Sequence, residues 1–187
     1  MAIIQSVPTP RTSTTNPTQM INNSWWYSSG NIYYPSYGLP NCTCYCYGEI
    51  GAILGHFETR LPSGDGGQWY PRAVLQGLLP VGSAPAAGAV ICWDDPNGIY
   101  LGHVAVVEYV NDDGSIFCSN SGYPDNYFWT STLTPASGYR ENWMISRGYR
   151  CQGFIYAYDM PPGITDDELI MLMLRRRRVD FYPWRNS

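Results

Sequence analysis

The sequence contains no lysine and only two histidines, so its fixed positive charge comes from arginine. Its 11 basic residues are outnumbered by 15 acidic ones, which gives a formal net charge of −4. A mildly acidic chain lacks the clustered positive charge with which proteins hold the phosphate backbone of nucleic acids. We therefore expect no nucleic acid partner.

Long apolar segments are also missing. The longest run, LIMLML at 169–174, is far shorter than the roughly 20 residues that a membrane-spanning helix needs. The start of the chain, MAIIQSVPTPRTSTT, has neither the charged beginning nor the apolar run of a secretory signal peptide. The sequence thus predicts no membrane span, and synthesis in the host cytoplasm without a signal peptide.

Composition divides the 187 residues into three parts. Residues 1–24 are rich in Ser, Thr, Pro, Asn and Gln and are predicted to form a polar arm. Residues 25–158 contain the signals for regular structure and are predicted to form one folded domain. Residues 159–187 form an extension, in which a capping box, an apolar run and four arginines predict a helix over 165–178. That helix would pack on its own domain or dock on another subunit.

The folded part begins with helix signals and continues with strand signals. Asn41 is a typical N-cap and Gly55 a typical residue beyond a helix end, which predicts a helix between them. Pro71 favours a second helix at about 70–78, in which it would occupy the first position. Runs rich in β-branched and aromatic residues predict strands at 88–93, 103–110, 115–120 and 153–159. A helix followed by an antiparallel meander is an α+β pattern.

The six cysteines have three possible uses: disulfides, metal ligands or a nucleophile. A chain of this size does not need disulfides, so reduced thiols are expected. Along the first helix Cys42 and Cys46 share a face while Cys44 points to the other side, so these thiols do not converge on a metal. We predict no metal site and no cofactor, and we expect the cysteines other than Cys42 to be buried core residues.

Cys42 differs from the others because it opens the predicted helix. A thiol in the first turn lies beside the positive end of the helix dipole and beside unpaired N–H groups, both of which favour the thiolate. The same region could hold a developing oxyanion, which makes the Cys42 N–H and Asn41 candidates for that role. Of the two histidines, His56 follows the far end of the helix, about 20 Å away. His103, at the start of a strand, is therefore the candidate base.

The register of a hairpin supplies a third candidate. If NDDG at 111–114 joins two strands with Val110 opposite Ser115, then Asn120 lies diagonally across from His103 on the same face of the sheet. Cys, His and Asn together form the constellation of papain-type thiol hydrolases: a nucleophile, a base, and a residue that orients the imidazole.

Several segments together resemble the CHAP family, the cysteine- and histidine-dependent amidohydrolases and peptidases. They are PNCTCYCYGE at 40–49, GAVICW at 88–93, GHVAVVEYVNDDGSI at 102–116, SN at 119–120 and QGFIY at 152–156. The resemblance covers about residues 37–158. It implies a papain-like fold in which an N-terminal nucleophile helix packs on an antiparallel β-sheet, with Cys42, His103 and Asn120 as the catalytic residues.

The resemblance also implies a function. CHAP domains cleave an amide bond of peptidoglycan, as N-acetylmuramoyl-L-alanine amidases or as endopeptidases of the peptide stem or cross-bridge. They occur in bacteriophage lysins, virion-associated wall hydrolases and bacterial autolysins. We expect a virion component or a lysin released through a holin, with peptidoglycan as partner. Other virion proteins or a second copy could bind through the 165–178 helix.

Two departures from the family pattern bear on activity. Many members carry Glu two residues before the Asn, where this chain has Cys118, so Asn120 must orient His103 without a charge. This leaves an alternative: an inactive structural or wall-binding virion component on the same fold. Some members bind calcium through an acidic loop before the nucleophile, but NIYYPSYGLPN at 31–41 contains no acid, and DDPNG at 94–98 is typical of a turn.

Aromatic residues make up 15% of the chain. Those between Trp25 and Tyr37 could line a groove for glycan or peptide, although ordinary packing suits them better. Trp93 and Tyr37 are the candidate substrate contacts. Trp129 and Trp143 are expected in the core or at its rim.

Overall fold

The structure is a computed structural model that describes residues 5–11 and 23–158. The helix predicted at 165–178, and the extension that contains it, lie outside the described residues. The division into arm, domain and extension stays a proposal, and residues 5–11 of the proposed arm pack against the domain.

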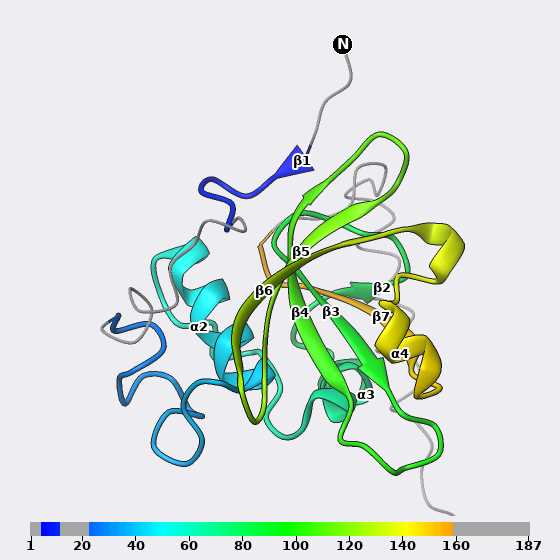
Figure 1. Ribbon diagram of the computed structural model, residues 1–187. Coiled ribbons are helices and arrows are strands. Elements are labelled where there is room, and N and C mark those ends of the chain that lie inside the picture. Colours follow the sequence, from blue (N-terminus) through cyan, green and yellow to red (C-terminus); the bar gives the residue numbers. More distant parts are fainter. Residues whose placement is uncertain (1–4, 12–22, 159–187) are drawn as a thin grey trace, which may run out of the picture.

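An antiparallel sheet of seven strands runs through the centre of the molecule (Figure 1). Across the sheet the strands follow the order β2 (Val81–Gly82), β7 (Arg150–Tyr156), β3 (Ala89–Asp94), β4 (His103–Val110), β5 (Ile116–Gly122) and β6 (Asn126–Leu133). The short strand β1 (Gln5–Ser6) pairs with the end of β4. The strands predicted from the sequence are confirmed to within a few residues, whereas β1, β2 and β6 were not predicted.

Helices pack on this sheet. α2 (Cys42–Leu54) contacts β4 and β5, and α3 (Gly66–Gln76) contacts β3, β4 and β7. The short helices η1 (Pro135–Ser137) and α4 (Asn142–Ser146) follow β6. This arrangement confirms the α+β class and the packing of the first helix on an antiparallel sheet.

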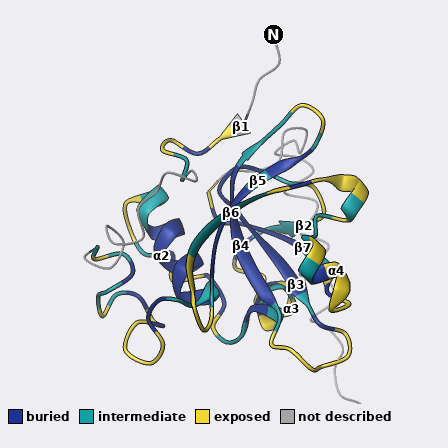
Figure 2. Cartoon of the chain, viewed as in Figure 1, coloured by how far each residue is buried: buried dark blue, intermediate teal, exposed yellow. Residues whose placement is uncertain are grey.

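Both faces of the central strands are buried (Figure 2). Because side chains alternate along a strand, β3 and β4 contribute to two separate cores. The first core includes Val90, Cys92, Val104 and Val106 and receives the side chains of α2. The second includes Ile91, Trp93, Ala105 and Val107 and receives Met144 of α4. A strand that is apolar on both faces fits the near-continuous apolar runs in the sequence.

α2 begins and ends where the sequence predicts. The Oδ1 of Asn41 accepts hydrogen bonds from the Cys44 N–H at 2.9 Å and the Thr43 hydroxyl at 2.7 Å. Gly55 closes the helix with a left-handed φ of 76° and donates its N–H to the Gly51 carbonyl. Cys42 is thereby fixed as the first residue of the helix.

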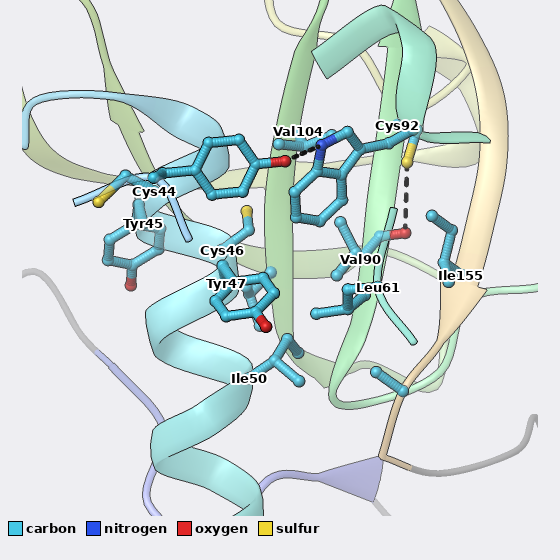
Figure 3. Packing of buried hydrophobic residues seen from close by; sticks show 14 of the residues in the cluster. Cys44, Tyr45, Cys46, Tyr47, Ile50, Leu61, Val90, Cys92, Val104 and Ile155 are labelled. Carbon is cyan, nitrogen blue, oxygen red and sulfur yellow. Dashed lines mark hydrogen bonds between the residues drawn. The ribbon is translucent and has the colours of Figure 1, made fainter. Parts of the chain in front are cut away.

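The cysteines of α2 separate as the helical period predicts. In Figure 3 Cys46 points towards the strands that carry Val104 and Cys92, while Cys44 points away. The Cys44 thiol donates to the carbonyl of Trp26 at 3.8 Å. Both side chains are fully buried, so they serve packing rather than chemistry.

The start of α3 differs from the prediction. The helix begins at Gly66 rather than near Tyr70, because Asp65 and Gln68 form a capping box that the sequence reading missed. Pro71 therefore lies inside the helix, where it cannot donate to the carbonyl of Gly67. That carbonyl instead accepts a hydrogen bond from Nε2 of Gln152 in β7, at 3.1 Å. The missing helical bond is replaced by one that ties α3 to the sheet.

The β4–β5 hairpin corrects the predicted register. Val110 pairs with Ile116, not with Ser115, because the turn is one residue longer on the β5 side than expected. A bulge at Glu108 then shifts the pairing, so that Val107 faces Cys118. The bulge restores the predicted register near the start of β4, although the turn itself was predicted wrongly.

Residues 5–11 attach to the domain at this bulge. The N–H of Val7, which is buried, donates to the Glu108 carbonyl, and the N–H of Arg11 donates to the Glu108 carboxylate. The Arg11 side chain forms an ion pair with Glu49 of α2 at 2.9 Å. One arginine thus joins two buried carboxyl groups from different elements.

In the described part of the chain, the helices are too short or too polar to cross a membrane.

Candidate active site

A cavity of about 730 Å³ opens where the first turns of α2 and α3 meet the start of β4. Cys42 and His103 both line it, together with Asn41 and Asp65. The turn after β5 and the segment 141–149 complete its wall. The two residues that the sequence proposes as nucleophile and base therefore share one cavity.

Burial governs the charge state of Cys42. It raises the pKa of the thiol to about 11, although hydrogen bonding from the backbone at Val104 and Thr43 acts in the opposite direction. The helix terminus favours the thiolate, and the sequence predicts that effect but not the burial. Desolvation is the larger effect here, so Cys42 rests as a neutral thiol near pH 7.

His103 is held by the residue that the hairpin register selected. Its Nε2 lies 3.2 Å from Oδ1 of Asn120, and Nδ2 of Asn120 donates to the Ser131 hydroxyl at 3.0 Å. With the amide oxygen facing it, Nε2 carries the proton, which leaves Nδ1 as the basic nitrogen. Burial lowers the His103 pKa to about 4, against a smaller effect of the Asn120 hydrogen bond. The imidazole is therefore neutral near pH 7.

Three tryptophans surround the imidazole of His103. Trp93 and Trp129 stack on it with ring centroids 5.7 and 5.6 Å away, and Trp143 meets it edge-on at 5.7 Å. They come from β3, β6 and α4. These rings remove water from the imidazole, which explains why its protonated form is disfavoured.

Close backbone contacts fix the position of His103. The start of α3 lies so near that a Cβ added to Gly66 would be 2.9 Å from the His103 backbone. Gly102, with a φ of 79°, brings its own backbone against Gly67, whose N–H donates to the Leu101 carbonyl at 2.9 Å. Glycine is therefore required at positions 66 and 102, where the helix meets the strand.

The candidate substrate contacts do not lie on the cavity. Trp93 is fully buried and donates its indole N–H to the Tyr139 carbonyl, so it packs against His103 inside the fold and not on the cavity wall. Tyr37 is 70% exposed and is not part of the cavity wall. Trp26 and Tyr33, from the same aromatic segment, belong to the core, which favours packing for that segment.

The oxyanion candidate Asn41 does line the cavity. Its Oδ1 is already engaged by the Thr43 hydroxyl and the Cys44 N–H. The side-chain Nδ2 is then the group that could donate to a substrate oxygen.

The sequence reading missed several residues of the cavity wall. They are Tyr100, Tyr123, Glu141, Arg147 and Tyr149. Tyr100 is positioned by Asp95, whose carboxylate accepts hydrogen bonds from the N–H groups of Asn97, Ile99 and Tyr100. The DDPNG segment indicates this turn, but no sequence signal connects it with residues 141–149.

Comparisons with known proteins identify bacterial relatives. A Streptococcus mutans protein named "Putative hydrolase" is 45% identical over 33% of this chain and 28% of its own length. The "Secreted 45 kDa protein" of Lactococcus lactis is 35% identical over 54% of this chain and 23% of its own length. The "Staphylococcal secretory antigen ssaA2" of Staphylococcus aureus is 33% identical over 60% of this chain and 39% of its own length. The chain thus spans less than two fifths of these relatives.

A solved structure titled as an N-acetylmuramoyl-L-alanine amidase from Staphylococcus aureus aligns with a TM-score of 0.45 and 28% identity. The alignment covers 52% of this chain and 28% of that one.

These relatives correct the predicted localisation. The expectation of cytoplasmic synthesis without a signal peptide, followed by action as a virion component or holin-released lysin, is wrong, because relatives are named as a secreted protein and a secretory antigen. The expectation rested on the first residues of the chain. Since the chain matches only part of each relative, those residues say nothing about export.

The family assignment rests on half of the chain. The sequence profile of the CHAP domain matches residues 29–122, a range that contains Cys42, His103 and Asn120. The same range holds the starts of α2, α3 and β4, which form part of the cavity wall. On this match, this chain belongs to the CHAP domain family.

Proposed function

We propose that this chain is a thiol hydrolase that cleaves an amide bond of peptidoglycan, with Cys42 as nucleophile, His103 as base and Asn120 as the residue that orients the imidazole. The observation that carries the proposal is the shared cavity of Cys42 and His103, in which Asn120 holds Nε2 and leaves Nδ1 available. Membership of the CHAP family supports hydrolysis and the choice of substrate.

In the proposed reaction, Nδ1 of His103 takes the proton of the Cys42 thiol as the sulfur attacks the amide carbonyl. The tetrahedral oxyanion is stabilised by the Cys42 N–H and by Nδ2 of Asn41. His103 then gives its proton to the departing amine, and the C–N bond breaks to leave a thioester. Water, deprotonated by His103, hydrolyses the thioester and restores the thiol.

The resting charges shape this mechanism. Burial raises the pKa of the thiol to about 11 and lowers that of the imidazole to about 4, which favours the neutral pair over thiolate and imidazolium before substrate binds. We therefore propose that proton transfer accompanies the attack, as it does for a serine nucleophile with a neutral base.

The same charges favour a second candidate function. A CHAP fold whose thiol stays protonated could bind peptidoglycan without cleaving it. The missing carboxylate at Cys118, two residues before Asn120, points the same way.

We propose a bacterial hydrolase and not a viral one. The relatives come from Streptococcus, Lactococcus and Staphylococcus, and two of them are named as secreted or secretory. A bacteriophage lysin or a virion protein is not part of the proposal.

The test is digestion of purified peptidoglycan, with the released fragments identified by mass spectrometry. The wild type should create new amine termini, and Cys42→Ala should reduce their rate by about 10³-fold or more. Cys44→Ala is the matched control, because this thiol is buried on the other side of α2, and it should retain the cleavage of the wild type.

The fragment masses decide between amidase and endopeptidase. Binding of peptidoglycan by the wild type without any release would establish the non-hydrolytic candidate. Equal cleavage by the wild type and Cys42→Ala would reject Cys42 as nucleophile.

A further inference from the structure

Arg147 supplies the positive charge of the cavity wall. The other charged lining residues are Asp65 and Glu141, and both carboxylates are engaged. Asp65 caps α3, and Glu141 accepts the indole N–H of Trp129 at 3.0 Å. His103 is neutral near pH 7. A negatively charged group that enters the cavity therefore has Arg147 as its one cationic partner among the described lining residues.

Two aromatic rings hold the Arg147 guanidinium. Its central carbon lies 5.0 Å from the ring centroid of Tyr100 and 5.5 Å from that of Trp143. Cation–π contacts of this kind orient a guanidinium, while its N–H groups stay available in the plane of the guanidinium itself. The backbone adds to this order, because Arg147 ends α4 and donates its N–H to the Trp143 carbonyl at 3.3 Å.

Among residues 5–11 and 23–158, no group accepts a hydrogen bond from this guanidinium. Ion pairs in the described part of the chain involve Arg11, Arg60 and Arg150. Among those same residues, no carboxylate lies within ion-pair distance of Arg147, although its side chain is held in place. An arginine that is ordered by aromatic contacts and unpaired with a carboxylate is suited to receive one from a ligand, because its fork of N–H donors matches the two oxygens.

The site lies close to the proposed chemistry. The ring centroid of Trp143 lies 5.5 Å from the central carbon of the guanidinium, and the same side chain meets the His103 imidazole edge-on at 5.7 Å. One tryptophan thus separates the cation from the base. An extended peptide advances about 3.3 Å per residue, so a group bound at Arg147 belongs to a residue near the cleaved amide.

From this arrangement we propose that Arg147 recognises a carboxylate of the substrate peptide, so that stems with free carboxylates are preferred over stems in which these groups are amides. The inference rests on the proposed function for the nature of the ligand. It adds a specificity residue that is absent from the Cys42, His103 and Asn120 constellation.

The test measures binding rather than turnover, so it does not depend on catalysis. Two stem tetrapeptides, L-Ala-γ-D-Glu-L-Lys-D-Ala with both carboxylates free and the same peptide with both as primary amides, are titrated by calorimetry into Cys42→Ala. The free form should bind about tenfold more tightly or better, in line with a charge-assisted pair. The difference should shrink at high ionic strength, because the guanidinium is exposed.

Substitutions assign the preference to Arg147. In the Cys42→Ala background, Arg147→Gln should make the affinities for the free and the amidated peptide equal. Arg147→Lys should keep part of the preference, because the charge remains but the planar donors are lost. Arg60→Gln is the matched control: it removes an arginine outside the cavity and should leave the tenfold difference unchanged.

The outcomes separate this inference from the proposed function. Equal affinity of Cys42→Ala for the two peptides, or a preference that survives Arg147→Gln, would overturn the carboxylate site. A preference that depends on Arg147 would support it even if the wild type cleaved neither peptide, in which case the proposed hydrolysis would fail alone.

Discussion

Trp129 lies almost parallel to His103, with ring centroids 5.6 Å apart and an angle of 19° between the planes. Its indole N–H donates to Glu141, which fixes the ring over the imidazole. Trp129 also lines the cavity, so it shields one face of the candidate base from solvent.

Trp129→Ala should raise the pKa of His103 from about 4 towards its ordinary value of 6.5, because water would reach the imidazole. The acidic limb of the pH–activity profile should move up with it. An NMR titration of the imidazole measures the shift directly, with Trp129→Phe as a control that keeps a stacked ring. An unchanged pKa in Trp129→Ala would show that the other two tryptophans suffice.

Gly66→Ala should destabilise the protein and disturb the site together. The added methyl group would be 2.9 Å from the His103 backbone, so α3 or β4 must move. We expect a loss of about 1 to 3 kcal/mol in the free energy of unfolding, as for overpacking elsewhere, and a lower kcat.

Gly67→Ala is the control for this prediction. Its methyl group would have a nearest neighbour at 3.2 Å, so it should cost less than Gly66→Ala. Denaturant unfolding measures both variants, and equal losses would contradict the steric argument.

Arg11→Met should cost far more stability than Arg60→Met. Removing the Arg11 side chain leaves the buried carboxyl group of Glu49 without its cation, a loss of about 3 kcal/mol or more. The Arg60 side chain is 54% exposed in its pair with Glu58, and such pairs contribute less than about 1 kcal/mol. Thermal and denaturant unfolding of the two variants check the contrast. Similar losses would show that Arg11 does not act by neutralising buried charge.

Glu108 should make the protein less stable as the pH rises above neutrality. Burial, and then the neighbouring Glu49, raise its pKa to about 8. Folding therefore favours the protonated form, and the stabilisation that this gives is complete below about pH 4.5 and lost as the pH approaches 8. His103, with its lowered pKa, acts in the opposite sense only between about pH 4 and 6.5.

The window above pH 6.5 therefore separates the effect of Glu108 from that of His103. Between pH 6.5 and 8.5 the free energy of unfolding should fall by about 1 to 2 kcal/mol. Glu108→Gln should flatten this dependence, whereas Asp112→Asn, at an exposed turn residue, should not. A slope that persists in Glu108→Gln would assign the effect to another group.

The sequence predicted the parts of the site that depend on local signals. Asn41 and Gly55 delimit α2, and thereby place Cys42 in its first turn. The strand that begins at His103 was predicted with its observed bounds. These features depend on caps and on period-2 patterns, which neighbouring residues determine.

The sequence predicted that His103 and Asn120 lie close together, but it did so from a hairpin turn that differs from the observed one. The observed turn is longer, and only the bulge at Glu108 brings the two residues back to the expected register. That bulge is stabilised by contacts with Arg11 and Ser119. Such long-range contacts leave no pattern in the local sequence.

The burial of the site residues could not be predicted from the sequence for a related reason. The pKa of His103 depends on how completely tryptophans from three elements exclude water. Likewise, Arg147 comes from a segment that no motif connects with Tyr100. Residues that meet only after the chain has folded require the structure.

The short strand β1 covers the exposed backbone edge at the end of β4. The ladder between β3 and β4 ends at Val90 and Val106, and β1 then pairs with Tyr109 and Val110. Without residues 5–11, the backbone groups at the end of β4 would stay unpaired beside a buried carboxyl group. Exposed strand edges of this kind recruit strands from other molecules. A chain that starts after Arg11 is therefore expected to self-associate, because residues 5–11 of the proposed arm cover this edge.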